Sequence, residues 1–186
     1  MSVALGLYAE FESVNSRDEF FNRFPAQDFP TIMDRTITWR IDRWEEESCK
    51  AYVVGAHSLD LPDQGIPSVL SAVEHNAIGF RLFHLLHKAS DLLFARVGFE
   101  ASAFSSSDLP DHVEKYSGVP FIKLDDCVVS DRLFHELGRP IGFEKFNEHC
   151  YWTKWQGVTY NPLYDESQTE LRDLVEQLFP NSYFRG

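Results

Sequence analysis

The sequence predicts an α+β fold in a single globular domain that covers residues 1–186. Three observations predict this class: strand patterns dominate the beginning of the chain, helical patterns dominate its middle, and a hairpin pattern followed by a helix ends it. A chain of 186 residues can bury one substantial core and is short for two. We therefore expect a mixed or antiparallel sheet with helices packed on it.

The first part of the chain predicts three strands and one short helix. Residues 3–11 are expected to form the opening strand, and residues 16–19 have the Ser-x-x-Glu form of a capping box, which begins a helix that Pro25 ends. Apolar and polar residues alternate over 37–42, which indicates a half-buried strand. An acidic run then separates this strand from residues 51–56, which suit a neighbouring antiparallel strand.

The middle of the chain predicts helical structure followed by strands. After a loop over 62–67, apolar residues recur at helical spacing, and their stripe changes phase at Asn76 and Gly79. We predict either a kinked helix or two consecutive helices here. Residues 94–101 and 119–124 are then expected to form strands, the second of them buried.

The last part of the chain alternates helix and strand patterns. Ser130 is expected to cap a short helix that ends at Gly138. Residues 151–160 predict a hairpin that turns at 156–157, and an amphipathic helix follows it and ends at Pro180. These patterns complete the predicted C-terminal hairpin plus helix.

Negative charge is spread evenly along the chain. The formal net charge is -12, from 29 acidic and 17 basic residues, and each half of the sequence contributes equally. A uniformly acidic surface repels phosphate backbones, so we expect no direct binding of nucleic acid. The same field speeds the encounter with a basic partner, although net acidity also serves solubility.

The cysteines and the apolar segments indicate a compartment. The chain has three cysteines, an odd number, and none of them has CxxC spacing. Its N-terminus lacks the basic and apolar regions of a signal peptide. We therefore expect a reduced, cytoplasmic protein. No apolar run approaches the roughly 18 to 20 residues of a membrane span, so we expect no membrane insertion.

One group of titratable residues could carry chemistry on a helix. His84, His87 and Asp91 are spaced i, i+3 and i+7, so a helix places them on one face, where they could bind zinc or transfer a proton. Arg81 and Lys88 share that face, however, and such a mixture is typical of a solvated surface. We interpret the group as surface rather than as a site.

Other candidates for chemistry are single residues or pairs. Asp125 and Asp126 follow the predicted strand 119–124 and could hold magnesium or simply solvate a turn. Cys127 could act as a nucleophile, but its apolar neighbours are expected to raise the pKa of the thiol. The motifs GxSxG, HExxH, GxxxxGK[ST] and GxGxxG are absent from the sequence. We therefore predict no catalytic residue, no metal site and no cofactor.

Aromatic content and acidity together favour binding over catalysis. The chain holds 16 Phe, 7 Tyr and 4 Trp, and large rings dominate the energetics of cores and interfaces. Because carboxylates complement a basic cleft, we predict a non-enzymatic acidic protein-binding module of the inhibitor or immunity type, which neutralises a basic protein partner. The residues predicted to contact that partner are Glu45, Glu46, Glu47, Asp125, Asp126, Trp152 and Lys154.

The hairpin is the most specific element of this hypothesis. Its alternation places Trp152 and Lys154 on the more polar face, where an exposed Trp would form an interface hot spot. The alternative is that a helix of the same domain covers Trp152. For the function, the alternatives are a small hydrolase that uses His and Asp or Glu, with or without a metal, and a structural subunit of a larger assembly. The sequence does not determine the oligomeric state.

Overall fold

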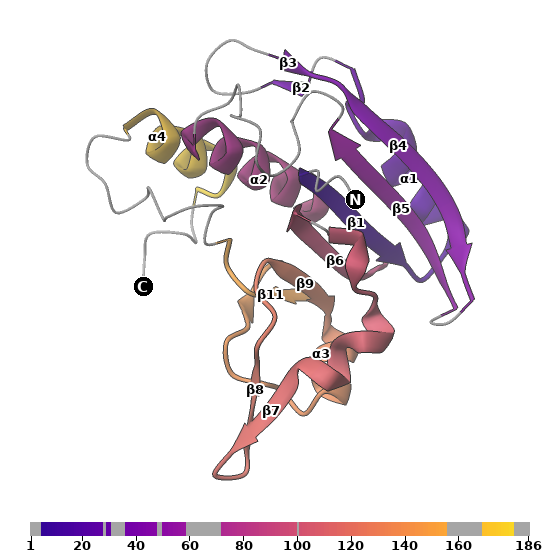
Figure 1. The fold of residues 1–186 in the computed structure, drawn as a ribbon, viewed down its shortest axis with the longest axis vertical. Helices are drawn as coiled ribbons and strands as arrows, with labels where there is room; N and C mark the ends of the chain where they lie inside the picture. Colours follow the sequence, from indigo (N-terminus) through magenta and orange to yellow (C-terminus); the bar gives the residue numbers. More distant parts are fainter. Residues whose placement is uncertain are drawn as a thin grey trace.

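The computed structural model describes residues 5–27, 29–30, 36–47, 50–58, 72–99, 101–155 and 169–180. Its main feature is a seven-stranded sheet in which all neighbouring strands are antiparallel, so the predicted α+β class is confirmed. The strand order is β10 (Glu144–Lys145), β11 (Cys150–Trp152), β9 (Cys127–Ser130), β6 (Leu92–Phe99), β1 (Leu5–Phe11), β5 (Ala51–Ser58) and β4 (Trp39–Glu46) (Figure 1).

Strand β1 lies inside the sheet, between β6 and β5, and is buried on both faces. It pairs with β5 on one side and β6 on the other, and all seven of its residues are buried. Side chains alternate between the two faces of a strand, so burial of every position requires a covering layer on each face. The predicted strand over 3–11 is confirmed within its described part.

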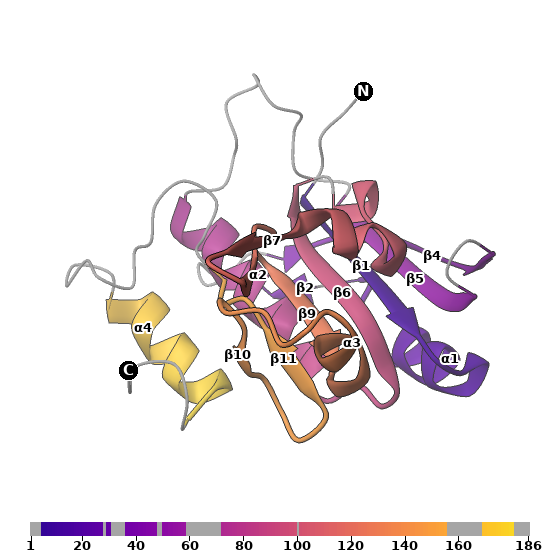
Figure 2. The ribbon, with the colours of Figure 1, turned by 90° about the horizontal axis from the view of Figure 1, so that it is seen from below.

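Three helices cover one face of the sheet: α1 (Val14–Arg23), α2 (Ala72–His87) and α4 (Thr169–Leu178). Helices α2 and α4 lie next to each other (Figures 1 and 2). The predicted first helix is confirmed, but its capping residue is Ser13, whose Oγ accepts a hydrogen bond from the backbone N–H of Ser16 at 3.2 Å. The core on this face includes Leu7, Phe11, Phe20, Leu82, Phe83 and Leu171.

The described part of α2 is one continuous helix, and Gly79 explains the change of phase in its sequence. A Cβ atom at Gly79 would lie 2.5 Å from the Trp155 ring. The indole N–H of Trp155 donates to Oδ1 of Asn76 at 3.1 Å, in a fully buried position. The helix therefore places a glycine and an amide, instead of larger apolar residues, where this ring contacts it.

Short elements cover the opposite face of the sheet. They are the 3-10 helices η1 (Ala101–Ala103) and η2 (Ser106–His112) and the helix α3 (Asp131–Glu136), and a second apolar cluster lies beneath them. The fully buried carboxylate of Glu10 accepts hydrogen bonds from the Tyr8 hydroxyl and from the backbone N–H of Ser106, both at 2.9 Å. Glu10 thus attaches the start of η2 to strand β1.

Two small sheets lie outside the main one. One pairs β2 (Phe29–Pro30) with β3 (Thr36–Ile37), and the other is a hairpin of β7 (Val113–Tyr116) and β8 (Val119–Ile122). The prediction of a buried strand over 119–124 is wrong about burial, because β8 pairs with β7 away from the main sheet and its residues are exposed or half-buried. No described helix is long and apolar enough to cross a membrane.

The pairing of β11 differs from the predicted hairpin. Strand β11 pairs with β9 and β10 instead of with a following strand, while residues 156–160 lie outside the described ranges. Glu45 and Glu46 are part of β4 itself, so the acidic run extends the strand that it was expected to end.

The contact between Gly79 and Trp155 leads to a stability prediction. In a solvated helix, Gly79→Ala would stabilise by about 1 kcal/mol. Here the added methyl overlaps a buried ring, and overpacking of this kind costs about 1 to 3 kcal/mol, so we expect net destabilisation in urea denaturation. Trp155→Leu removes the overlap, and in that background the same glycine change should become neutral or stabilising. Equal losses in both backgrounds would contradict this account.

Candidate functional site

The acidic run lies at the end of the outermost strand of the main sheet. Glu45 and Glu47 are exposed and Glu46 is half-buried, with Glu45 opposite Tyr52 of β5. Neither Glu45 nor Glu47 forms an ion pair with another described residue. These two carboxylates are therefore available to a partner.

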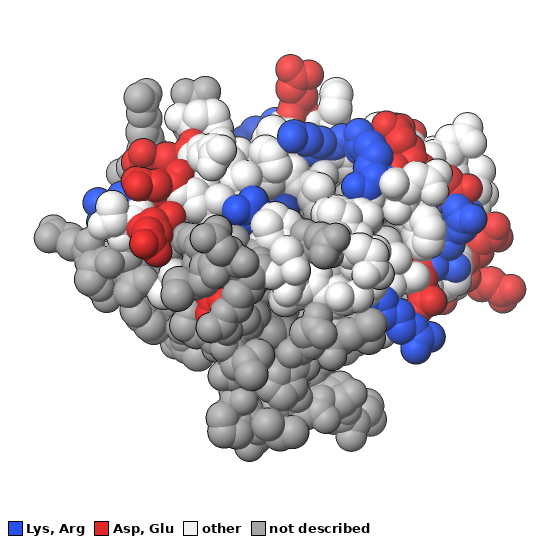
Figure 3. Space-filling model, turned by 90° about the horizontal axis from the view of Figure 1, so that it is seen from above, with Lys and Arg blue, Asp and Glu red and all other residues white. Residues whose placement is uncertain are grey.

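Asp125 and Asp126 lie far from this run, in the connection between β8 and β9. Asp125 is exposed, while Asp126 adopts a left-handed backbone conformation with φ of 59° and its carbonyl accepts a hydrogen bond from the N–H of Val97 at 3.1 Å. Four strand spacings separate β9 from β4, which is about 19 Å. The two acidic groups do not form one patch. Figure 3 likewise shows acidic side chains at separate places on one face of the molecule, with basic ones between them.

Trp152 belongs to the core. Its side chain is 3% exposed and contacts Phe83, Phe146 and Phe179, with ring centroids 5.3, 4.9 and 5.8 Å away. The expectation of an exposed Trp152 is wrong, because the face of β11 on which it lies is the face that α2 covers. The alternative, a helix of the same domain over the ring, is the arrangement observed.

Lys154 follows β11 and makes an internal contact. Its Nζ lies 2.8 Å from Oε2 of Glu144 in β10, and the lysine side chain is only 23% exposed. This ion pair joins the end of β11 to the edge strand beside it. Of the residues predicted to contact a partner, those with the most accessible charge are therefore Glu45, Glu47 and Asp125.

His84, His87 and Asp91 do not share a helix face. Helix α2 ends at His87, and Asp91 lies beyond it with a φ of 49°, where its Oδ2 accepts a hydrogen bond from the Ser16 hydroxyl at 2.7 Å. The His84 ring contacts Phe179 edge to face at 5.8 Å. The two imidazoles thus pack against aromatic rings, while Asp91 holds the start of α1.

The described thiols lie in surroundings that suppress reactivity. Burial raises the pKa of Cys127 and that of Cys150 to about 12. The Sγ of Cys127 lies 3.6 Å from Oγ1 of Thr153. This confirms the expectation of a raised thiol pKa at Cys127. Among the residues that the structure describes, no group of three or more His, Cys, Asp or Glu residues could hold a metal ion.

The feature that sequence reasoning missed is a projecting hairpin, residues 113–122, which we call the arm. It extends away from the sheet at the bottom of Figure 1. Four large hydrophobic side chains are exposed in the described part of the chain, and three of them lie on or beside the arm: Tyr116 at 78%, Val119 at 49% and Ile141 at 62%. Tyr116 and Val119 flank the turn, and we call these two residues the tip, whereas Ile141 lies beside Phe121, nearer the base of the arm.

Backbone hydrogen bonds hold the arm in one conformation. Ser117 and Gly118 form a two-residue turn with φ of 51° and 84°, the positive values of a type I′ hairpin. Ile141 lies beside β8, because its N–H donates to the carbonyl of Pro120 at 2.9 Å and its carbonyl accepts from the N–H of Ile122 at 3.2 Å. The tip is therefore presented on an ordered backbone.

Charged residues surround the arm at both ends. At its base, the N–H of Lys123 donates to the carbonyl of His112 at 2.9 Å, and the exposed Asp111 and Asp125 flank this pair of residues. Neither of these aspartates has an ion-pair partner among the described residues. Next to the tip lies the exposed Lys115, whereas the exposed Arg139 donates from its Nε to Nδ1 of His135 at 3.3 Å. The arm thus combines an apolar tip with an acidic base.

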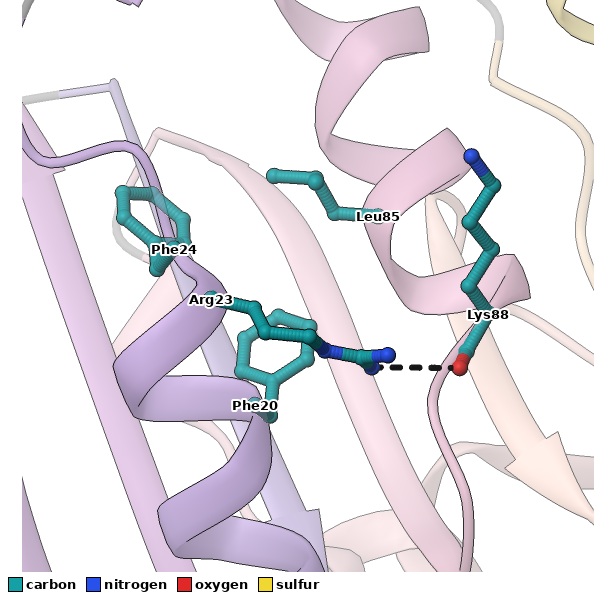
Figure 4. A pocket seen from close by; sticks show the side chains of 5 residues that line it. All are labelled: Phe20, Arg23, Phe24, Leu85 and Lys88. Carbon is teal, nitrogen blue, oxygen red and sulfur yellow. Dashed lines mark hydrogen bonds between the residues drawn. The ribbon is translucent and has the colours of Figure 1, made fainter.

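A small pocket of about 210 Å³ opens between α1 and the end of α2. Its apolar walls are Phe20, Phe24 and Leu85, and the Arg23 guanidinium crosses it to donate to the carbonyl of Lys88 at 3.3 Å (Figure 4). This hydrogen bond joins the two helices. The pocket lies on the helix-covered face and contains none of the predicted contact residues.

One signal in the sequence could have located the arm. Ser117 and Gly118 form a turn dipeptide between two short runs that contain Val and Tyr or Phe, which is a hairpin pattern. The exposure of its side chains could not be derived in this way, because it depends on the position of β8 outside the main sheet. In comparisons with known proteins, no family model, curated protein or solved structure matches the chain.

The burial of Trp152 gives a direct test of its role. We expect Trp152→Ala to lower the free energy of unfolding by about 3 to 5 kcal/mol, the usual cost of truncating a buried Trp. Chemical denaturation measures this change, and Lys154→Ala serves as a control with a much smaller expected loss. A variant Trp152→Ala as stable as the wild type would show that the ring does not support the core.

The two histidines of α2 predict a dependence of stability on pH. Burial, followed by the charge of Lys88, lowers the pKa of His84 below 6.5, and burial also lowers that of His87. The unfolded chain therefore binds more protons near pH 6, so stability should decrease as the pH falls below about 6.5. The variant His84→Phe keeps a ring against Phe179 and should show a weaker decrease in urea denaturation. An unchanged pH dependence in this variant would contradict the prediction.

Proposed function

We propose that the protein is a non-enzymatic, acidic protein-binding module of the inhibitor or immunity type, which inserts the tip of its arm into a cleft of a basic protein partner. The observation that carries this proposal is the exposure of Tyr116 and Val119 at the turn of one ordered projection, with Ile141 exposed beside its strand β8. Exposure of large apolar side chains to water is unfavourable, and such exposed groups are typical of protein interfaces.

The tip supplies the apolar part of the proposed interface. Burial of a large apolar side chain contributes about 2 kcal/mol, and Tyr is among the residues that most often dominate binding energy. Because the turn at Ser117 and Gly118 is already formed, little conformational entropy is lost when the tip is buried. An ordered apolar projection of this kind fits a concave surface.

The carboxylates supply the electrostatic part. Asp111 and Asp125 at the base of the arm would meet the rim of the cleft that receives the tip, so a basic rim is complementary to them. The net charge of -12 would also accelerate the approach of a basic protein. Lys115 lies next to the tip and would face hydrogen-bond acceptors deeper in the cleft. A reducing compartment such as the cytoplasm agrees with the free thiols of Cys127 and Cys150.

A capture experiment tests the proposal. The immobilised wild-type protein should retain a basic protein from extract of its native cells at low salt and release it as salt is raised. With that partner purified, Tyr116→Ala should weaken binding at least about tenfold in calorimetry, while the melting temperature stays nearly unchanged because the side chain is exposed. If the partner is an enzyme, the wild-type protein should inhibit it.

A matched control uses the fourth exposed hydrophobic residue, Val14, which lies on α1 away from the arm. Val14→Ala should leave partner binding unchanged. Asp111→Lys combined with Asp125→Lys should slow association and reduce its dependence on salt. Retention of the partner with full affinity by Tyr116→Ala, or loss caused equally by Val14→Ala, would overturn the assignment of the arm.

A further inference from the structure

Strand β4 forms one edge of the main sheet and pairs on one side only. Its eight residues pair with β5 in continuous register from Trp39 opposite Ser58 to Glu46 opposite Ala51. No described strand pairs with its outer side, and Figure 1 places it at the margin of the sheet. The other edge strand, β10, has only two residues.

The orientation of the outer backbone groups follows from one hydrogen bond. The N–H of Trp39 donates to the carbonyl of Ala26 at 2.8 Å, so Trp39 directs its backbone groups away from β5. In an antiparallel strand, alternate residues point the same way. The N–H and C=O groups of Ile41, Arg43 and Glu45 therefore also point outward, and they form no backbone hydrogen bond with a described residue.

The edge lacks some of the features that block strand addition and has others. Natural edge strands are often protected by proline, by a bulge or by charged side chains, lysine above all. Strand β4 contains no proline and no lysine and its register has no shift, but five of its eight residues are charged. The Arg43 side chain folds back over α1, 3.0 Å from Oδ1 of Asp18 and above the Phe21 ring. This arrangement leaves the backbone of Arg43 uncovered by its own side chain.

The charge of the edge becomes negative toward its end. Arg40 pairs with Asp42 at 3.0 Å, whereas Asp18 is shared between Arg17 at 2.8 Å and Arg43 at 3.0 Å, so this group of three keeps one positive charge. Glu45 and Glu47 have no such partner among the described residues. An added strand would therefore meet a paired Arg40 and Asp42, a net positive charge at Arg43, and carboxylates without an ion-pair partner among the described residues at Glu45 and Glu47.

We propose that the outer edge of β4 binds an extended segment of the basic protein partner, which adds to the sheet as one more strand. This inference rests on the proposed function, since it gives the partner a second contact besides the arm. The backbone of the segment would pair with Ile41, Arg43 and Glu45, and its Lys or Arg side chains would face Glu45 and Glu47. The occupant is thus a strand-forming segment whose Lys or Arg side chains lie at the end that pairs with Glu45 and Glu47.

A peptide experiment tests the edge without the natural partner. The probe, the Lys peptide, is an eight-residue peptide of alternating Thr and Val with blocked ends, in which Lys replaces two Thr at one end, and the matched control, the Glu peptide, carries Glu at the same two positions. In NMR titration, the Lys peptide should shift the amide signals of Ile41, Arg43 and Glu45 most strongly, and the Glu peptide should not. Equal binding of the two peptides, or shifts confined to another surface, would overturn the proposal.

Two variants separate the backbone from the charge. Arg43→Pro removes an outward N–H without touching the pairing with β5, so it should weaken binding of the Lys peptide at least tenfold, whereas Arg43→Ala should retain it. Glu45→Lys combined with Glu47→Lys should abolish binding of the Lys peptide and confer binding of the Glu peptide. This pair of changes keeps the test decisive if the proline variant unfolds. Unaltered binding of the Lys peptide to the charge-reversed variant would overturn the proposal.

The arm distinguishes the failure of this inference from the failure of the proposed function. Tyr116→Ala should leave binding of the Lys peptide unchanged, because the tip lies outside the main sheet. If Tyr116→Ala loses the natural partner while the Lys peptide does not bind β4, the edge inference is wrong and the proposed function stands. If the peptide binds β4 but Tyr116→Ala keeps the partner, the arm assignment is wrong.

Discussion

The burial of β1 on both faces is the constraint on which the rest of the structure depends. A strand whose seven residues are all buried needs a layer on each side, and the chain supplies α1, α2 and α4 on one face and η1, η2 and α3 on the other. Glu10 fixes the second layer by accepting the Ser106 N–H. Because β7 begins directly after η2, the arm starts from this second layer and is directed away from the sheet.

The high aromatic content serves the core first. The ring centroids of Trp152 and Trp155 lie 5.3 and 6.0 Å from that of Phe83 in α2. Aromatic packing therefore joins the end of β11 to α2. The number of aromatic residues in the sequence therefore does not indicate how many of them contact a partner. Among the described aromatic residues, the exposed Tyr116 was distinguishable only by its position at a turn outside the main sheet.

Local patterns in the sequence predicted those elements whose formation depends on neighbouring residues. The strands near 3–11 and 51–56 and the amphipathic α4 follow from periodicity, and their described parts are present. Features that depend on contacts between distant parts of the chain could not be predicted from these local patterns. The position of β4 at the edge, the burial of Trp152 under α2 and the existence of β9 (Cys127–Ser130) depend on which strands pair, and a four-residue strand is too short to show a period.

The two proposed contacts, at the arm and at the edge of β4, would respond differently to salt concentration. Burial of the tip is an apolar contribution that salt hardly weakens, whereas the carboxylates at Glu45 and Glu47 act through a field that salt screens within about 10 Å. Two contacts on one partner reinforce each other only if both can be occupied together. The ordered turn of the arm and the unbroken register of β4 favour this, because both elements keep their geometry before binding. A partner that contacted only one of these elements would gain only one of the two contributions to the binding free energy. Specificity would therefore arise because one protein must offer both a cleft and an extended basic segment.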